Sequence, residues 1–423
     1  MNRGFPISGK ITGSLLLPLL PPLPPLFVSS PICLYDVFTA ELVAILIGMQ
    51  MTNIPAQIGD SLENVDTPAL IIDLDAFESN LFKMAAFAKS AGVGLRPHAK
   101  THKCPTIALK QIAAGAVGQC CQKVGEAEAL VRGGVRDVLV SNQIVGIHKL
   151  RRLAALAKDA TIALCFDSPD QVTAASNAAC EAGVQLGGLV EIDVGMQRCG
   201  VASPDAANDL AQRINDAPGL IFRGLQAYHG VAQHLPSVPE RQVAIQSAAD
   251  IVRATLERLS KSGISCELIS GAGTGTFRFE GLSGLWNELQ VGSYVFMDTD
   301  YAQIGGDGTN RFTDFEHSLF VLATVMSKTV SDRAIVDAGL KSYSGEKGPP
   351  WLHNRPGLEV VGVSDEHGKI KIGPDAKQLS LGDKVLLIPG HCDPTVNLHD
   401  WYVCVRKGRV ESLWPITARG AST

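Results

Sequence analysis

A lysine that could do covalent chemistry stands in a basic segment of the first third of the chain. Lys100 lies within LRPHAKTHK, residues 95–103, just after residues 93–98, which we expect to form a strand. A lysine partly withdrawn from water at a strand end has a lowered pKa, which suits the formation of a Schiff base with a carbonyl compound. An exposed basic loop would show the same spacing, so the pattern alone leaves both interpretations open.

A histidine and an aspartate near the C-terminus could bind a metal ion. His391 and Asp393 lie in PGHCDPT, residues 389–395, after a predicted strand. On an extended chain, residues i and i+2 face the same way, so the two side chains could bind one cation. An imidazole with a carboxylate suits Mn²⁺, Mg²⁺ or another octahedral ion. The alternative is a histidine–aspartate hydrogen bond that stabilises a turn.

Further polar residues stand where other predicted strands end: Gln122, Arg198, Tyr228 and His234. The segment 271–275 (GAGTG) follows a late strand, and its backbone N–H groups could bind a phosphate. Tight turns also need glycine, so this motif gains weight only from its position late in a barrel.

The elements that must position these residues form a repeating pattern between residues 67 and 310. After an opening strand at 69–74, short apolar segments alternate with helical patterns such as 105–114 and 240–262. Eight segments have the character of strands: 93–98, 117–121, 137–140, 161–166, 188–192, 222–227, 266–269 and 289–294. Their number favours a parallel (β/α)₈ barrel over a doubly wound sheet, and such barrels bind ligands at the carboxyl ends of their strands.

The sequence changes character after about residue 310. Residues 311–423 contain strand-like segments and no long helical pattern, which predicts a second, all-β domain that carries His391 and Asp393. The strand-like segments are 318–328, 333–338, 358–363, 384–389 and 402–405.

Composition restricts the class of protein. The chain has 423 residues, 46% of them hydrophobic, which predicts at least two well-buried domains. A net charge of -5 argues against a nucleic-acid partner. Ten cysteines without a CxxC pair indicate a reducing, cytoplasmic location.

Residues 1–50 differ from the rest because seven prolines interrupt their apolar segments. The prolines prevent a continuous membrane-spanning helix, so we expect no membrane association. Our preferred interpretation is that translation begins at Met49 or Met51, and a targeting peptide is the alternative.

Taken together, the motifs are similar to those of a known family. From Asp66 to Gly420 the chain resembles the D-threonine aldolase and 3-hydroxy-D-aspartate aldolase group, within the alanine-racemase-like enzymes that use pyridoxal 5'-phosphate (PLP). The resemblance covers LRPHAKTHK, CCQKVGEAEA, EIDVGMQRCG, QAYHG, GAGTG, NELQVGSYVFMD, VDAGLKS and PGHCDPTVNLHDW. One departure is Ala272, where relatives often have glycine.

The resemblance implies roles for individual residues. Lys100 would carry PLP, and His234 would lie near the β-hydroxyl of the substrate. The other cofactor-binding residues would be Gln122, Arg198, Tyr228, Gly273, Thr274 and Gly275. His391 and Asp393 would bind a divalent metal, most simply Mn²⁺ or Mg²⁺.

The implied activity is cleavage of a small-molecule D-3-hydroxy amino acid, such as D-threonine or 3-hydroxy-D-aspartate, to glycine and an aldehyde by a homodimer. A D-serine or 3-hydroxyaspartate dehydratase is the main alternative, although such relatives tend to carry His-x-Cys where this chain has His-x-Asp. An amino-acid racemase would need no metal. A non-catalytic PLP carrier would usually be a barrel alone.

A chain that begins at Met51 should be soluble and as active as the full-length protein, because the prolines keep residues 1–50 from packing as a helix or a central strand. Purifying and assaying both versions side by side checks this. An inactive or insoluble shortened chain, or a native protein whose first peptide maps within residues 1–48, would contradict it.

Overall fold

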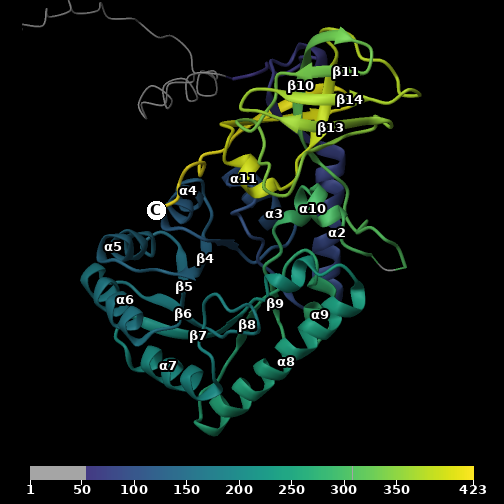
Figure 1. The fold of residues 1–423 in the computed structure, drawn as a ribbon. Helices are drawn as coiled ribbons and strands as arrows, with labels where there is room; N and C mark the ends of the chain where they lie inside the picture. Colours follow the sequence, from purple (N-terminus) through teal and green to yellow (C-terminus); the bar gives the residue numbers. More distant parts are fainter. Residues whose placement is uncertain (1–53, 307) are drawn as a thin grey trace, which may run out of the picture. The chain divides into compact units, whose positions relative to one another are not determined.

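The computed structural model describes residues 54–306 and 308–423, so the expectations for residues 1–50 lie outside the described part of the chain. In that part, eight strands with parallel pairings form the sheet of the first domain (Figure 1). The strands are β2 (Gly94–Leu95), β3 (Gln119–Cys121), β4 (Asp137–Gln143), β5 (Thr161–Phe166), β6 (Leu186–Glu191), β7 (Leu220–Ala227), β8 (Leu268–Gly271) and β9 (Glu288–Leu289).

The sheet closes on itself into a barrel. Its order runs β2, β9, β8, β7, β6, β5, β4, β3, and backbone bonds then connect the two ends. The N–H of Val117 donates to the carbonyl of Leu95, and the N–H of Cys120 donates to the carbonyl of Pro97. The predicted (β/α)₈ barrel is confirmed.

Helices alternate with the barrel strands and lie on the outside of the sheet (Figure 1). They are α2 (Leu74–Ala91), α3 (Pro105–Ala113), α4 (Val124–Arg132), α5 (Ile147–Leu156), α6 (Pro169–Ala182), α7 (Pro204–Asp216), α8 (Val238–Lys261) and α9 (Phe277–Gly281). Ser168 and Ser203 cap α6 and α7, each followed by a proline whose missing N–H is not needed there. None of the described helices is long and apolar enough to cross a membrane.

Alternation along the strands divides the apolar side chains into two layers. Cys120, Leu139, Cys165 and Leu189 form one buried cluster inside the barrel. Their sequence neighbours, such as Val138 and Val140, belong to a second cluster that includes residues of the surrounding helices. Cysteine therefore serves as a small apolar side chain in this barrel.

The second domain is a mixed sheet with the order β13, β14, β11, β10, β1, β16, β17, in which β15 pairs with β10 and β12 with β15. The strands are β1 (Ala69–Asp73), β10 (Leu319–Val330), β11 (Arg333–Val336), β12 (Trp351–Leu352), β13 (Leu358–Val363), β14 (Gly368–Ile372), β15 (Lys384–Ile388), β16 (Trp401–Arg406) and β17 (Arg409–Pro415). One short helix, α11 (Cys392–Val396), interrupts this β structure.

The boundary between the domains differs from our expectation that residues 67–310 all belong to the barrel. Strand β1 pairs antiparallel with β10 and parallel with β16 in the second sheet. Four of its five residues are buried, which is typical of a strand covered on both faces. The described part of the chain therefore starts in the second domain, and α2 connects this domain to the barrel.

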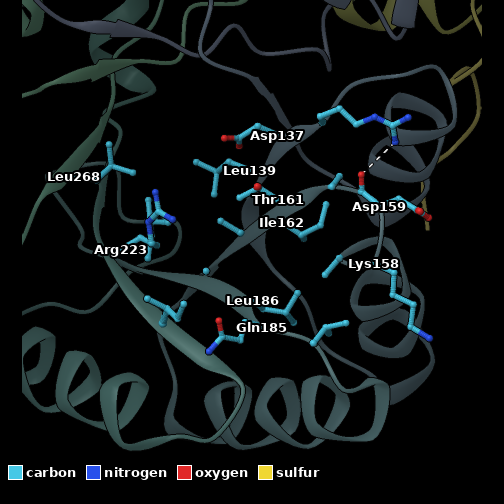
Figure 2. A pocket seen from close by; sticks show the side chains of 18 of the residues that line it. Asp137, Leu139, Lys158, Asp159, Thr161, Ile162, Gln185, Leu186, Arg223 and Leu268 are labelled. Atoms are coloured by element: carbon cyan, nitrogen blue, oxygen red, sulfur yellow. Dashed lines mark hydrogen bonds between the residues drawn. The ribbon is translucent and has the colours of Figure 1, made fainter.

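A cavity of about 810 Å³ lies at the amino end of the barrel, where β4, β5 and β6 begin (Figure 2). Arg96 lines it and is held by two carboxylates: its Nη1 lies 2.6 Å from Oδ1 of Asp137, and its Nε lies 2.9 Å from Oε2 of Glu288. This cavity is at the opposite end from the one where barrels bind substrates. The Arg96 cluster therefore stabilises the fold rather than serving catalysis.

Replacing Arg96 by methionine should lower the free energy of unfolding by about 3 kcal/mol or more, because Glu288 would remain buried without its partner. Urea denaturation measures the change. Arg223→Met is the control, since Arg223 lines the same cavity but is exposed. Equal stability of the Arg96 variant and the wild type would contradict the role of this ion pair.

Candidate active site

A second cavity of about 670 Å³ opens at the carboxyl ends of the barrel strands. Seven of the residues predicted from the sequence line it: Lys100, Gln122, Arg198, Tyr228, His234, Gly273 and Thr274. Since these residues come from the segments after five different strands, barrel closure is what brings them together.

Lys100 lies on the turn after β2, and its ammonium group is paired. Nζ of Lys100 lies 2.9 Å from Oδ2 of Asp393, which belongs to the second domain. The charge of Asp393 raises the pKa of Lys100, although burial alone would lower it. Our expectation of a lowered lysine pKa is therefore wrong for the structure described, because the sequence pattern did not include this partner.

Burial acts on Asp393 in the opposite direction, since it favours the neutral acid. The positive charge of Lys100, with its hydrogen bond, outweighs burial and holds the pKa of Asp393 below its usual range. The result is an ionised carboxylate in a largely buried position, stabilised by the ammonium group of the other domain.

His391 and Asp393 do not lie on an extended segment, contrary to our expectation. His391 is the residue before α11, and Asp393 is in the first turn of that helix. Nδ1 of His391 contacts the carboxylate of Glu346, and Oδ1 of Asp393 is buried without a hydrogen-bond partner among the described residues. In residues 54–306 and 308–423 no three His, Cys, Asp or Glu side chains form a cluster that could hold a metal ion.

Sequence reasoning missed His98 and Ser141, which line the cavity beside Gln122. Nε2 of His98 lies 2.9 Å from Nε2 of Gln122 and 3.2 Å from Oγ of Ser141. Burial, reinforced by the charge of Lys100, lowers the pKa of His98 well below its usual value. This imidazole is therefore neutral. The sequence signal that could have identified His98 is its position two residues before Lys100.

Arg198 and Tyr228 form another part of the wall. The guanidinium carbon of Arg198 lies 6.0 Å from the centre of the Tyr228 ring, at the outer limit of a cation–π contact. Burial raises the pKa of Tyr228, so its hydroxyl remains protonated. The pair offers one positive charge and one hydroxyl to the cavity.

Two glycines of GAGTG, Gly273 and Gly275, lie against the side chain or backbone of Gln233. A Cβ atom on Gly273 would lie 2.5 Å from Oε1 of Gln233, and one on Gly275 would lie 2.2 Å from the Gln233 carbonyl oxygen. The N–H of Gly275 donates to Oε1 of Gln233 at 3.0 Å, and Gly275 is not among the residues that line the cavity. The N–H of Gly275 is thus directed to Gln233. Ala272 adopts the left-handed conformation, with φ of 69°.

His234 ends the short 3₁₀ helix η2 (Val231–His234), which follows β7. Its Nδ1 lies 3.0 Å from Oδ2 of Asp300, and its ring centre lies 5.0 Å from that of Tyr301. Both partners belong to α10 (Thr299–Ala302). One imidazole nitrogen of His234 is therefore directed to a carboxylate, while the side chain lines the cavity.

Comparisons with known proteins show which proteins this chain is similar to. The family model described as "Alanine racemase, N-terminal domain" matches residues 72–300, and "Putative serine dehydratase domain" matches residues 318–405. A D-threonine aldolase from Arthrobacter sp. is 50% identical over 87% of this chain and 96% of its own length. A 3-hydroxy-D-aspartate aldolase from Paracoccus denitrificans (strain Pd 1222) is 44% identical, with the same coverage.

Solved structures give the same result. The crystal structure of D-threonine aldolase from Filomicrobium marinum superposes with a TM-score of 0.85, at 48% identity over 87% of this chain and all of that one. A D-threo-3-hydroxyaspartate dehydratase from Delftia sp. (strain HT23) is more distant in sequence, at 29% identity over 79% of this chain and 93% of its own length.

Of the two lysines in LRPHAKTHK, Lys100 should be the one that reacts with PLP. Lys100 lines the cavity, whereas the ammonium group of Lys103 contacts Glu126 and is nearly buried. Lys100→Ala should abolish the visible absorbance band of protein-linked PLP and the activity, while Lys103→Ala should keep the band. Borohydride reduction followed by peptide mapping measures the attachment site, and PLP on Lys103 would contradict the assignment.

Proposed function

Because this chain belongs to the family of the D-threonine and 3-hydroxy-D-aspartate aldolases, which are lyases, we propose that it cleaves D-3-hydroxy amino acids to glycine and an aldehyde with PLP and a divalent metal. D-Threonine would give acetaldehyde, and 3-hydroxy-D-aspartate would give glyoxylate. The observation that carries the proposal is the 2.9 Å contact between Nζ of Lys100 and Oδ2 of Asp393. It brings a carboxylate of the second domain to the lysine at the mouth of the barrel.

The residues at the barrel mouth fit PLP. The cavity volume is within the usual range for small-molecule sites. Lys100 would link the aldehyde, Arg198 would face the ring nitrogen, and Gln122 and Tyr228 would line the ring. Gly273 and Thr274 would hold the phosphate. Gly275 would contribute indirectly through Gln233, since its N–H already has a partner.

The residues of the second domain fit a divalent cation. Oδ1 of Asp393 is a buried carboxylate oxygen without a hydrogen-bond partner among the described residues, and such an atom needs a cation or a donor. Because Nδ1 of His391 contacts Glu346, Nε2 would be the nitrogen left for the metal. Oxygen and imidazole ligands suit Mn²⁺ or Mg²⁺.

The chemistry follows from these positions. PLP, when bound, supplies an electron sink for the pair released as the Cα–Cβ bond breaks. The cation, when bound, supplies a Lewis acid for the β-hydroxyl oxygen. His234 would take the hydroxyl proton while the oxygen becomes the carbonyl of the aldehyde, and Cα would gain a proton to give glycine. Arg198 would keep a positive charge at the ring nitrogen and disfavour its protonation.

Further features of the proposal concern assembly and location. We expect a homodimer in the cytoplasm, as the family resemblance and the ten cysteines without a CxxC pair suggest. A dehydratase of the same fold is the second candidate, because the family model for the second domain bears that name. The His-x-Asp pair at 391–393 favours the aldolase.

The first experiment compares the products. With D-threonine or 3-hydroxy-D-aspartate, the PLP-loaded protein should release an aldehyde and glycine, measured by an aldehyde-linked dehydrogenase assay and by amino-acid analysis. The same samples are assayed for ammonia as a control. Release of ammonia with a keto acid, and no aldehyde, would support the dehydratase instead.

Removing the metal should stop chemistry while leaving cofactor binding nearly unchanged, because PLP would be held by groups of the barrel. EDTA, or Asp393→Ala, should lower kcat by on the order of 100-fold, and kcat should fall more than KM rises because the metal acts on charge that develops in the transition state. Added Mn²⁺ or Mg²⁺ should restore the EDTA-treated wild type. Full activity in protein shown by elemental analysis to be metal-free would contradict the metal role.

A further inference from the structure

We propose that Asp300 is the positioning residue for His234, holding the imidazole so that Nε2 faces the substrate. The inference rests on the proposed function, in which His234 takes the hydroxyl proton. Nδ1 of His234 lies 3.0 Å from Oδ2 of Asp300, which is an ion-pair distance, although the ring N–H does not point closely enough along this contact to count as a hydrogen bond. A carboxylate at one ring nitrogen fixes the tautomer and orientation of a histidine and leaves the other nitrogen free to act as a base.

His234 and Asp300 differ in their exposure and in their access to the cavity. The His234 side chain is 38% exposed and lines the cavity, whereas Asp300 is 20% exposed and does not line it. Asp300 therefore acts through His234 and does not reach the substrate. Burial opposes the charge of Asp300, but the contacts with His234 and Lys347 outweigh burial and lower its pKa, so the carboxylate is ionised.

Asp300 is itself held firmly, as a positioning residue must be. It lies on α10, and its backbone N–H donates to the carbonyl of Gly390 at 3.3 Å. Asp298 caps the same helix by accepting from the N–H of Tyr301 at 3.0 Å. The other oxygen of Asp298 accepts from the N–H of Cys392 at 2.9 Å. The helix that carries Asp300 is thus bonded to the loop that carries His391 and Asp393.

The proton-accepting histidine and the proposed metal ligands therefore share one support. His234 comes from the barrel, and the residues at 391–393 come from the second domain. Asp300 contacts the first directly, and its helix is bonded to the segment of the second. The arrangement fixes the position of His234 relative to the segment that carries His391 and Asp393, and a fixed position of the base is what a proton transfer requires.

Lys347 offers a competing explanation for the presence of a carboxylate at Asp300, namely an ion pair with Lys347. Its Nζ lies 3.5 Å from the same Oδ2 atom, and its side chain is 40% exposed. If Asp300 existed only to pair with Lys347, the contact would be a surface ion pair of little energetic value. The shorter distance to His234 and the position of His234 in the cavity favour the role in proton transfer.

The test uses the full-length, PLP- and metal-loaded protein and its variant Asp300→Asn. We expect kcat for aldehyde release from the better of D-threonine and 3-hydroxy-D-aspartate to fall about 10- to 100-fold, because general-base catalysis contributes about 10²–10⁴-fold in total. KM, the PLP absorbance band and the metal content should change by less than about twofold. Asp300→Glu should restore part of the rate.

Asp314→Asn is the matched control. Asp314 is 22% exposed and lies 2.9 Å from Nε of Arg278, so it is an ion-paired carboxylate of similar burial that does not contact His234. We expect its kcat to equal that of the wild type. Lys347→Met, which removes the competing partner, should change kcat by less than about twofold.

A double-mutant cycle decides whether Asp300 acts through His234. In a His234→Gln background, Asp300→Asn should lower kcat by no more than a further twofold, since the two residues act as one unit. A wild-type kcat in Asp300→Asn, a full further loss in the His234→Gln background, or equal losses in Asp300→Asn and Lys347→Met would overturn the inference. A wild-type protein that releases no aldehyde from any D-3-hydroxy amino acid would overturn the proposed function and, with it, this inference.

Discussion

The ion pair between Lys100 and Asp393 is the constraint on which the rest of the site depends. It requires that the turn after β2 and the first turn of α11 meet, although they belong to different domains and are far apart in the sequence. A largely buried carboxylate such as that of Asp393 is stable as an ion only when a cation is held next to it in a well-defined geometry. The surrounding contacts at Asp298, Gly390 and Glu346 fix the second-domain side of this meeting.

Three histidines of the site have identified partners within the fold. His234 has Asp300, His391 has Glu346, and His98 is neutral between Gln122 and Ser141. Because of these contacts, a protein side chain rather than water orients one ring nitrogen of each histidine. The barrel thus supplies Lys100 and most of the cavity wall, while the second domain and α10 supply the carboxylates that contact Lys100 and His234.

The sequence alone predicted much of the barrel, because its strands are short apolar segments separated by helices with clear caps. It misplaced β1, since a buried strand of five residues looks the same in either sheet. It singled out Lys100 and His234, which line the cavity, and His391 and Asp393, whose role in metal binding stays a prediction. It gave the wrong direction for the lysine pKa and the wrong backbone for residues 391–393, because both depend on tertiary contacts. Asp300 has no local motif, and only the pairing of α10 with η2 reveals it.

The central position of β1 has a consequence for how the protein is made. Residues 69–73 leave the ribosome long before β10 and β16, the two strands that flank them in the sheet. At about 5–20 residues per second, the delay before β10 emerges is on the order of ten seconds. During that time an apolar strand has no native neighbour on either edge, and unpaired edges invite association with other chains. The sheet of the second domain can therefore be completed only after the C-terminal strands have been synthesised.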